Sequence, residues 1–225
     1  MAQAGLHGMV AQAVHKWVPR REWLMLGIVF GSLFPDADNI LVAVATVTKQ
    51  PVEGLHRTFT HSLFTIAFVV VVFYLVSLVT KNKRWNNLGI GLGIGILLHI
   101  LLDLLIWFDG VMILWPLPYW LNFWENATPP DWFMTLMQPL ELLFFALFFV
   151  GLGAMARKQR SDLGYLGKLR IWTWLQLVLF VVFTILVYML QKGFMTPYGA
   201  VYLLSLALAI GVTIRMRKTV EAVQV

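Results

Sequence analysis

Long apolar runs alternate along the chain with short polar and basic segments. A helix needs about 20 apolar residues to cross the hydrocarbon core of a bilayer. Measured against that length, the pattern predicts membrane helices at residues 23–47, 61–80, 88–108, 136–156, 170–190 and 198–214. A weaker apolar segment at residues 3–18 would cross the bilayer, dip into it or lie along its surface. The predicted fold is therefore all-α: a polytopic bundle of six strong membrane helices, preceded by a short, re-entrant or interfacial N-terminal helix.

This pattern gives no reason to divide the chain, since it contains no internal repeat, no low-complexity stretch and no linker. We therefore expect a single membrane domain over residues 1–225. Within it, residues 1–120 carry most of the ionisable groups at membrane depth, and residues 136–225 add three supporting membrane helices.

The composition agrees with an integral membrane protein, because 60% of the residues are hydrophobic and 12% are charged, against about 25% charged in a soluble domain. The chain has no cysteine, which excludes disulfides and thiolate catalysis, so any metal ion must be bound by His and carboxylate side chains. The net charge of +6 comes from basic clusters between apolar runs. Such clusters orient a protein in its membrane and do not predict nucleic-acid binding.

The basic clusters also assign sides to the connections. Clusters at residues 81–84, 157–170 and 215–218 predict cytoplasmic segments. The connection at residues 109–135 has neither Lys nor Arg and is rich in Trp and Tyr, which is typical of an interfacial loop on the external side. Alternation of sides then places residues 49–60 on the external side as well.

Ionisable side chains at membrane depth are the most informative feature of the sequence. Each costs about 2.5–3.5 kcal/mol at the centre of a bilayer, so such groups need partners and usually mark a functional site. They occur in GSLFPDADNI, in HRTFTHSL and in GILLHILLDLL, and the side chains concerned are Asp36, Asp38, His56, His61, His99 and Asp103.

Each of these motifs has a purely structural explanation when it is taken alone. The acidic pair could cap a helix end, the histidines of HRTFTHSL could anchor the chain at the interface, and His99 could form one buried hydrogen bond with Asp103. The predicted topology, however, brings all three motifs to one depth in the outer half of the membrane. Imidazole and carboxylate ligands without thiolate suit Zn, Mn or Fe, so we expect a divalent metal, zinc first, with two ions as an alternative to one.

The same motifs resemble a known family. PDAD, HRTFTHSL and HILLD followed by GVMILWPL have the order and spacing of the YdjM-like family of membrane-bound, inner-membrane metal-dependent hydrolases. The resemblance covers roughly residues 5–120 and includes Gly110, Trp115 and Pro116. It places an early family histidine at His7 and implies that His7 joins the other candidate ligands. The resemblance also implies a location in the inner membrane of a prokaryote. The family looks distantly similar to zinc-dependent phospholipase C, and that similarity implies a lipid phosphoester as substrate.

Further residues near the motifs are expected to assist. Arg57 could contact a phosphate oxygen or pair with an Asp, because its guanidinium suits planar bidentate contacts. Glu141 could be a ligand, a general base or a hydrogen-bond partner of Gln138. Thr60 and Ser62 are expected to orient the imidazole rings.

Two functions fit these residues. The first is a metal-dependent hydrolase that cleaves a phosphoester of a lipid or other amphiphile with metal-activated water at the external membrane face. The alternative is a cation transporter, or a metal-binding membrane protein without turnover, that uses the same His and Asp cluster. The expected partners are membrane lipids and a lipid or phosphoester substrate, with a homodimer as a further option and no nucleic acid.

Overall fold

The computed structural model describes residues 3–190 and 194–221, and these residues form helices, turns and loops without a β-strand. Within these ranges, five helical segments are long and apolar enough to cross a membrane: Leu63–Thr80, Lys83–Ile106, Asp131–Gln159, Leu163–Met189 and Met195–Arg215. A sixth candidate is a bent pair made of Leu24–Leu33 and Pro35–Thr48. The predicted fold class, an all-α polytopic membrane protein, is confirmed.

Contacts group the chain into two compact units. The motif unit is Ala13–Thr128 and contains the PDAD, HRTFTHSL and HILLD motifs. The α6 unit, named after helix α6 (Asp131–Gln159), is Met1–Gln12 together with Pro129–Val225. The expectation that the whole chain forms one membrane domain stays a prediction.

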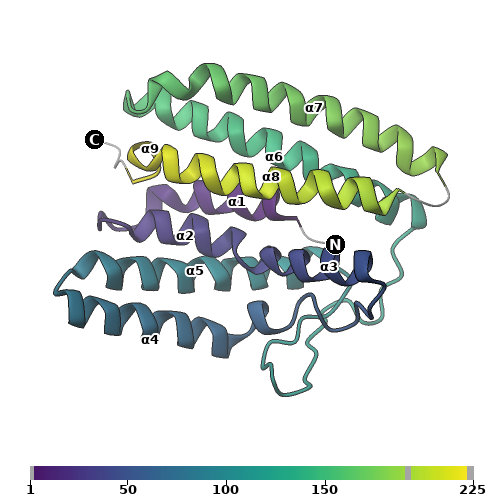
Figure 1. Ribbon diagram of the computed structural model, residues 1–225, viewed down its shortest axis with the longest axis horizontal. Coiled ribbons are helices and arrows are strands. Elements are labelled where there is room, and N and C mark those ends of the chain that lie inside the picture. Colours follow the sequence, from purple (N-terminus) through teal and green to yellow (C-terminus); the bar gives the residue numbers. More distant parts are fainter. Residues whose placement is uncertain (1–2, 191–193, 222–225) are drawn as a thin grey trace. The chain divides into compact units, whose positions relative to one another are not determined.

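The motif unit is built around α5. The elements of this unit are η1 (Val14–Trp17), α2 (Leu24–Leu33), η2 (Pro35–Asp38), α3 (Asn39–Thr48), η3 (Phe59–His61), α4 (Leu63–Thr80) and α5 (Lys83–Ile106). In Figure 1, α5 lies between α2 and α4 and contacts both. A loop follows α5, and its only described pairing of strand type is the isolated antiparallel bridge between Val111 and Leu121.

Pro35 interrupts the first membrane segment. Proline lacks a backbone N–H, and its ring clashes with the preceding helical turn. The chain therefore leaves α2, passes through the short 3-10 turn η2, and enters α3 at an angle of 40°. This interruption was predicted from the sequence, and it leaves Asp36 and Asp38 buried in the turn.

Glycines bring α2 and α5 together. A Cβ atom on Gly27 or Gly31 of α2 would overlap the backbone of α5, and one on Gly91 or Gly95 would overlap the backbone of α2. Small residues at such spacing allow membrane helices to approach closely. The end of α2, at Ser32, is thereby held against the turn of α5 that carries His99.

The α6 unit contains α1 (Ala4–Ala13), α6 (Asp131–Gln159), η4 (Leu163–Tyr165), α7 (Leu166–Met189), α8 (Met195–Arg215) and α9 (Arg217–Glu221). Along its length α6 packs on α7, and it also contacts α8 and α9 (Figure 1). Gln3 and Gln12 donate side-chain hydrogen bonds to the backbone carbonyls of Met137 and Phe148 in α6. With 10 residues, α1 is too short to span a bilayer, in agreement with the predicted short N-terminal helix.

Candidate metal centre

Three segments of the motif unit bring His and Asp side chains together. The turn η2 supplies Asp36 and Asp38, HRTFTHSL supplies His56 and His61, and α5 supplies His99 and Asp103. Two groups could hold a metal ion: Asp36 with His61 and His99, and Asp38 with His56 and His61. In each group the candidate ligand atoms lie within 4.8 Å of one another. All of these side chains are buried except His56, which is partly exposed.

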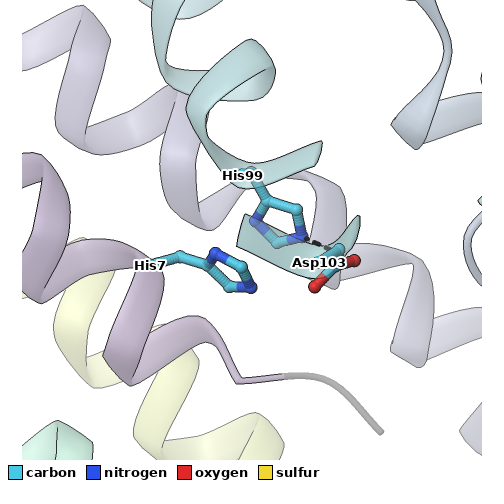
Figure 2. Close-up of side chains that lie close together, drawn as sticks. All are labelled: His7, His99 and Asp103. Atoms are coloured by element: carbon cyan, nitrogen blue, oxygen red, sulfur yellow. Dashed lines mark ion pairs between the residues drawn. The ribbon is translucent and has the colours of Figure 1, made fainter. Parts of the chain in front are cut away.

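His99 and Asp103 occupy successive turns of α5. Residues four apart lie on the same face of a helix, and Figure 2 shows the imidazole and the carboxylate side by side, with His99 Nε2 3.6 Å from Asp103 Oδ2. The HILLD spacing therefore places an imidazole and a carboxylate, both candidate ligands, on one face of α5, as the sequence predicted.

The distances between donor atoms match the edges of a metal coordination sphere. His61 Nε2 lies 3.1 Å from His99 Nε2 and 3.4 Å from Asp103 Oδ2. Asp36 Oδ1 lies 3.7 Å from His99 Nε2. A tetrahedral zinc ion with bonds of about 2.0–2.1 Å keeps its ligand atoms about 3.3 Å apart. Each of these pairs of atoms therefore has a spacing that suits two ligands of one small divalent ion.

The tautomer of His99 follows from its hydrogen bond to α2. Its Nδ1 lies 2.8 Å from the backbone carbonyl oxygen of Ser32. A carbonyl oxygen only accepts, so Nδ1 carries the proton and the lone pair of the neutral ring is on Nε2. That lone pair points towards the converging ligand atoms.

Thr60 assigns the tautomer of His61 in the same way. The Thr60 hydroxyl lies 2.8 Å from Asp38 Oδ2 and 2.9 Å from His61 Nδ1. The Thr60 hydroxyl has one proton and donates it to the Asp38 carboxylate, so its oxygen accepts a hydrogen bond from the Nδ1–H of His61. The lone pair of neutral His61 is then also on Nε2. A metal ligand oriented through its second ring nitrogen in this way is a common feature of protein metal sites.

Two lone pairs therefore face each other at 3.1 Å, between His61 Nε2 and His99 Nε2. Two acceptors at that distance repel unless a proton or a metal ion lies between them. The carboxylates of Asp36 and Asp103, close to the same two nitrogens, add negative charge that favours a divalent cation.

Asp36 strengthens this interpretation. Its carboxylate is buried, and neither oxygen has a hydrogen-bond partner among the residues that the structure describes. A buried carboxylate without hydrogen bonds is strongly unfavourable unless a cation lies beside it. The donor set of two imidazoles and two carboxylates fits a zinc, manganese or iron ion.

Asp38 links His56 to Thr60, which contacts His61, the member shared by the two groups of candidate ligands. Its Oδ1 accepts from His56 Nδ1 at 2.7 Å, and its Oδ2 accepts from Thr60. Burial lowers the pKa of the His56 imidazole, while the hydrogen bond to Asp38 acts in the opposite direction. With its proton on Nδ1, neutral His56 presents Nε2, which is buried and has no hydrogen-bond partner within the described ranges. His56 is thus suited either to bind a second ion or to accept a proton.

Arg57 lies between the cluster and the surface. Its backbone has the left-handed φ of 60°, and its N–H donates to Asp38 Oδ2 at 3.3 Å. Its Nε is 3.6 Å from Asp103 Oδ2, and its Nη1 is 3.6 Å from the exposed carboxylate of Asp109. The guanidinium also lies over the Trp107 ring. Arg57 therefore pairs with Asp103 and Asp109, which is one of the two roles expected of it. Its contact with an anion stays a prediction.

Sequence reasoning missed two parts of this arrangement. Ser32 contributes a backbone carbonyl, which leaves no side-chain pattern to detect. Asp109 pairs with Arg57 but lies in the Trp- and Tyr-rich connection at residues 109–135, where a carboxylate looks like an ordinary surface residue. Its position three residues after α5 was the only available signal.

Ser62 supports the loop around the cluster. Its hydroxyl oxygen caps α4 by accepting from the backbone N–H of Phe64, and it donates to the carbonyl oxygen of Trp115. Ser62 thus joins the start of α4 to the loop that follows α5. An orienting contact from Ser62 to an imidazole ring stays a prediction.

The remaining candidates belong to the α6 unit. His7, which Figure 2 also labels, lies on α1 and is buried. Glu141 is buried in α6 and accepts from the backbone N–H of Gly5 at 2.8 Å. The backbone carbonyl of Gln138 accepts from the Tyr198 hydroxyl. The roles of His7, Glu141 and Gln138 in the site stay predictions.

Comparison with protein families gives a match over most of the chain. Residues 3–214 match the family described as YdjM inner membrane protein. The search of curated proteins and the search of solved structures each gave no match.

Proposed function

The chain belongs to the YdjM inner membrane protein family, and from that premise we propose that it is a membrane-bound, metal-dependent hydrolase. The family membership predicted from the motifs is confirmed, and the apolar helices agree with a location in the inner membrane. The hydrolase activity is our proposal, and its support comes from the residues of the motif unit.

One observation carries the proposal. Two buried imidazoles direct their Nε2 lone pairs at each other across 3.1 Å, beside the carboxylates of Asp36 and Asp103. A divalent ion is the species that satisfies all four side chains at once, and zinc is the first choice because it favours nitrogen and oxygen ligands in four-coordinate sites. His56 and Asp38 lie next to this set through their link to His61 and could hold a second ion.

A hydrolase needs an activated water, a place for the anionic group and a proton acceptor. A bound divalent ion lowers the pKa of a water ligand and polarises a phosphoryl oxygen. Arg57 is suited to bind a non-bridging phosphate oxygen, because its guanidinium lies within 3.6 Å of Asp103 and extends towards the exposed Asp109. His56, neutral and held by Asp38, can accept a proton at Nε2.

The loop around Asp109 favours an amphiphilic substrate. Trp115, Tyr119, Trp120 and Trp124 of this loop are all exposed. Exposed Trp and Tyr side chains concentrate where a membrane meets water. We therefore propose a lipid phosphoester as the substrate class. The lack of basic residues in this loop favours the extracytoplasmic face for the site.

The first test is the metal content of the protein purified in detergent. We expect a bound divalent metal in the unmodified chain and its loss in His61→Ala and Asp103→Ala, with size-exclusion profiles showing that both variants remain folded. Equal metal content in all three proteins would refute the site. Where a variant fails to fold, the milder His99→Gln replaces it in the same measurement.

The second test asks whether the loaded protein turns over. It is given a panel of phospholipids, and chelation followed by metal addition serves as the control. Metal-dependent release of a headgroup or a diglyceride supports the hydrolase. Cation uptake into liposomes without any lipid product would instead support the alternative of a transporter that uses the same cluster.

A further inference from the structure

A second candidate site lies at the opposite ends of α4 and α5 from the metal cluster. His61 lies two residues before the start of α4, and a hollow of about 500 Å³ is formed where α4 ends and α5 begins. From residue 63 to residue 78 a helix rises roughly 22 Å, so the hollow is remote from the His and Asp cluster. Its size is within the range of about 300–1,000 Å³ that is typical of ligand pockets.

Two cationic side chains, Arg21 and Lys83, line this hollow. The neighbouring carboxylate, Glu22, is bound to Arg84, whose Nε lies 2.6 Å from Glu22 Oε2. Among the residues that the structure describes, no carboxylate forms an ion pair with Arg21 or Lys83. The hollow therefore carries uncompensated positive charge.

The neutral polar groups of the hollow also favour an anionic ligand. The Asn87 side-chain amide donates one hydrogen bond to the backbone carbonyl oxygen of Glu22, at 3.0 Å, and has a second N–H to donate. The Asn86 amide and the Tyr74 hydroxyl are further donors in the lining. A phosphodiester has only acceptor oxygens at neutral pH, so cations and N–H or O–H donors are the groups that recognise it.

The position of the hollow identifies the source of the phosphate. It lies at the ends of two membrane-crossing helices, next to the exposed apolar side chains Leu75, Leu78 and Val79 of α4. Phosphate groups of lipids occupy that depth, and their acyl chains would run along the apolar face of α4. Basic pockets between membrane helices on the cytoplasmic side are known to suit anionic headgroups.

We infer that this hollow binds the headgroup phosphate of an anionic phospholipid, with Arg21 and Lys83 as the charge contacts and Asn86 as a hydrogen-bond donor. This site is separate from the metal cluster and does not depend on the proposed hydrolysis. It would fix the ends of α4 and α5 against the lipid surface. The competing explanation is that these cations only orient the chain in its membrane, without a specific lipid.

Native mass spectrometry of the full chain in detergent tests the inference, with phosphatidylglycerol and phosphatidylcholine of identical acyl chains as the probes. We expect phosphatidylglycerol to be retained at least several-fold better. Arg21→Gln with Lys83→Gln should abolish that preference, and Asn86→Ala should weaken it without changing the charge. The matched control, Lys158→Gln with Lys168→Gln, removes two exposed charges outside the hollow and should keep the preference.

Three outcomes would overturn the inference. One is an unchanged preference for phosphatidylglycerol in Arg21→Gln with Lys83→Gln, provided that thermal unfolding shows this variant to be folded. Another is an equal loss in the Lys158 and Lys168 control, which would show a general charge effect. The third is complete displacement of the lipid by inorganic phosphate at millimolar concentration, which would identify a free phosphate site.

Discussion

The Nε2 atoms of His61 and His99 lie 3.1 Å apart. In each ring the other nitrogen, Nδ1, carries the proton and donates a hydrogen bond, so both Nε2 atoms have a lone pair. His61 is held through Thr60, and His99 is held by the carbonyl oxygen of Ser32. The two rings come from different segments, η3 and α5, and both are fully buried. The two nitrogens therefore repel each other unless a proton or a metal ion lies between them. The predictions below test the metal ion.

Metal binding should stabilise the folded protein. A ligand that binds only the folded state adds about 2.7 kcal/mol to the free energy of unfolding when its concentration is 100 times its Kd. We expect zinc to raise the Tm of the chelated protein in detergent by several degrees, and expect no such rise in His99→Ala. His15→Ala is the matched control, because His15 lies in η1 and outside both candidate ligand groups. A zinc-induced rise that persists in His99→Ala would contradict the role of this ring.

The Thr60 hydroxyl should tune metal affinity without binding the metal. Thr60→Val keeps the shape of the side chain but removes the bridge between Asp38 and His61. Loss of a group that orients a ligand typically lowers metal affinity about 10- to 100-fold. The measurement is competition against a chelator of known affinity. Thr46→Val is the control, since the Thr46 hydroxyl bonds only within its own helix, to Val42.

The sequence predicted the membrane helices and the approach of the three motifs, because both depend on patterns that a sequence carries. Apolar runs of sufficient length indicate the membrane helices. The basic clusters assign each connection to one side of the membrane, and this topology places Asp36, His61 and His99 at one depth. Pro35 likewise indicates the interruption. Gly91 and Gly95, four residues apart in the sequence, are the small residues that let α5 pack closely against α2.

The ring tautomers and the ion pair of Arg57 could not be predicted in the same way. They depend on which backbone groups and loop residues meet after packing. The Ser32 carbonyl reaches His99 only because Gly95 allows the two helices to touch, and nothing in the residue types identifies that pair. Asp109 reaches Arg57 through the course of a loop that carries no periodic pattern.

The contact between α2 and α5 should be needed for the metal site. In Gly95→Ala, the new Cβ would overlap the Ile28 carbonyl oxygen and the Ser32 backbone N, so the helices must separate. Overpacking of this kind typically costs about 1–3 kcal/mol. We expect a lower Tm together with weaker zinc binding, because Ser32 moves away from His99. In the control, Gly211→Ala, the added methyl group meets open space in α8 and should leave both quantities nearly unchanged.

Arg57 should bind anions beside the loaded metal site without being needed to hold the metal. Its guanidinium is within 3.6 Å of Asp103 and Asp109, but it has no lone pair to offer a cation. Arg57→Gln should therefore retain zinc while its zinc-dependent affinity for inorganic phosphate falls about tenfold or more, a change of about 1.4 kcal/mol. The measurement is isothermal titration of phosphate into loaded and chelated protein, and the difference isolates the metal-dependent part.

Arg84→Gln is the matched control for this titration, because Arg84 pairs with Glu22 at the other end of α5. It should leave the metal-dependent phosphate affinity unchanged. Loss of zinc from Arg57→Gln would assign this side chain to the support of Asp103 instead of to anion binding. Equal phosphate affinity in Arg57→Gln and the unmodified chain would remove Arg57 from the proposed reaction, because a guanidinium that contacts the transferred group must also contribute to binding the product anion.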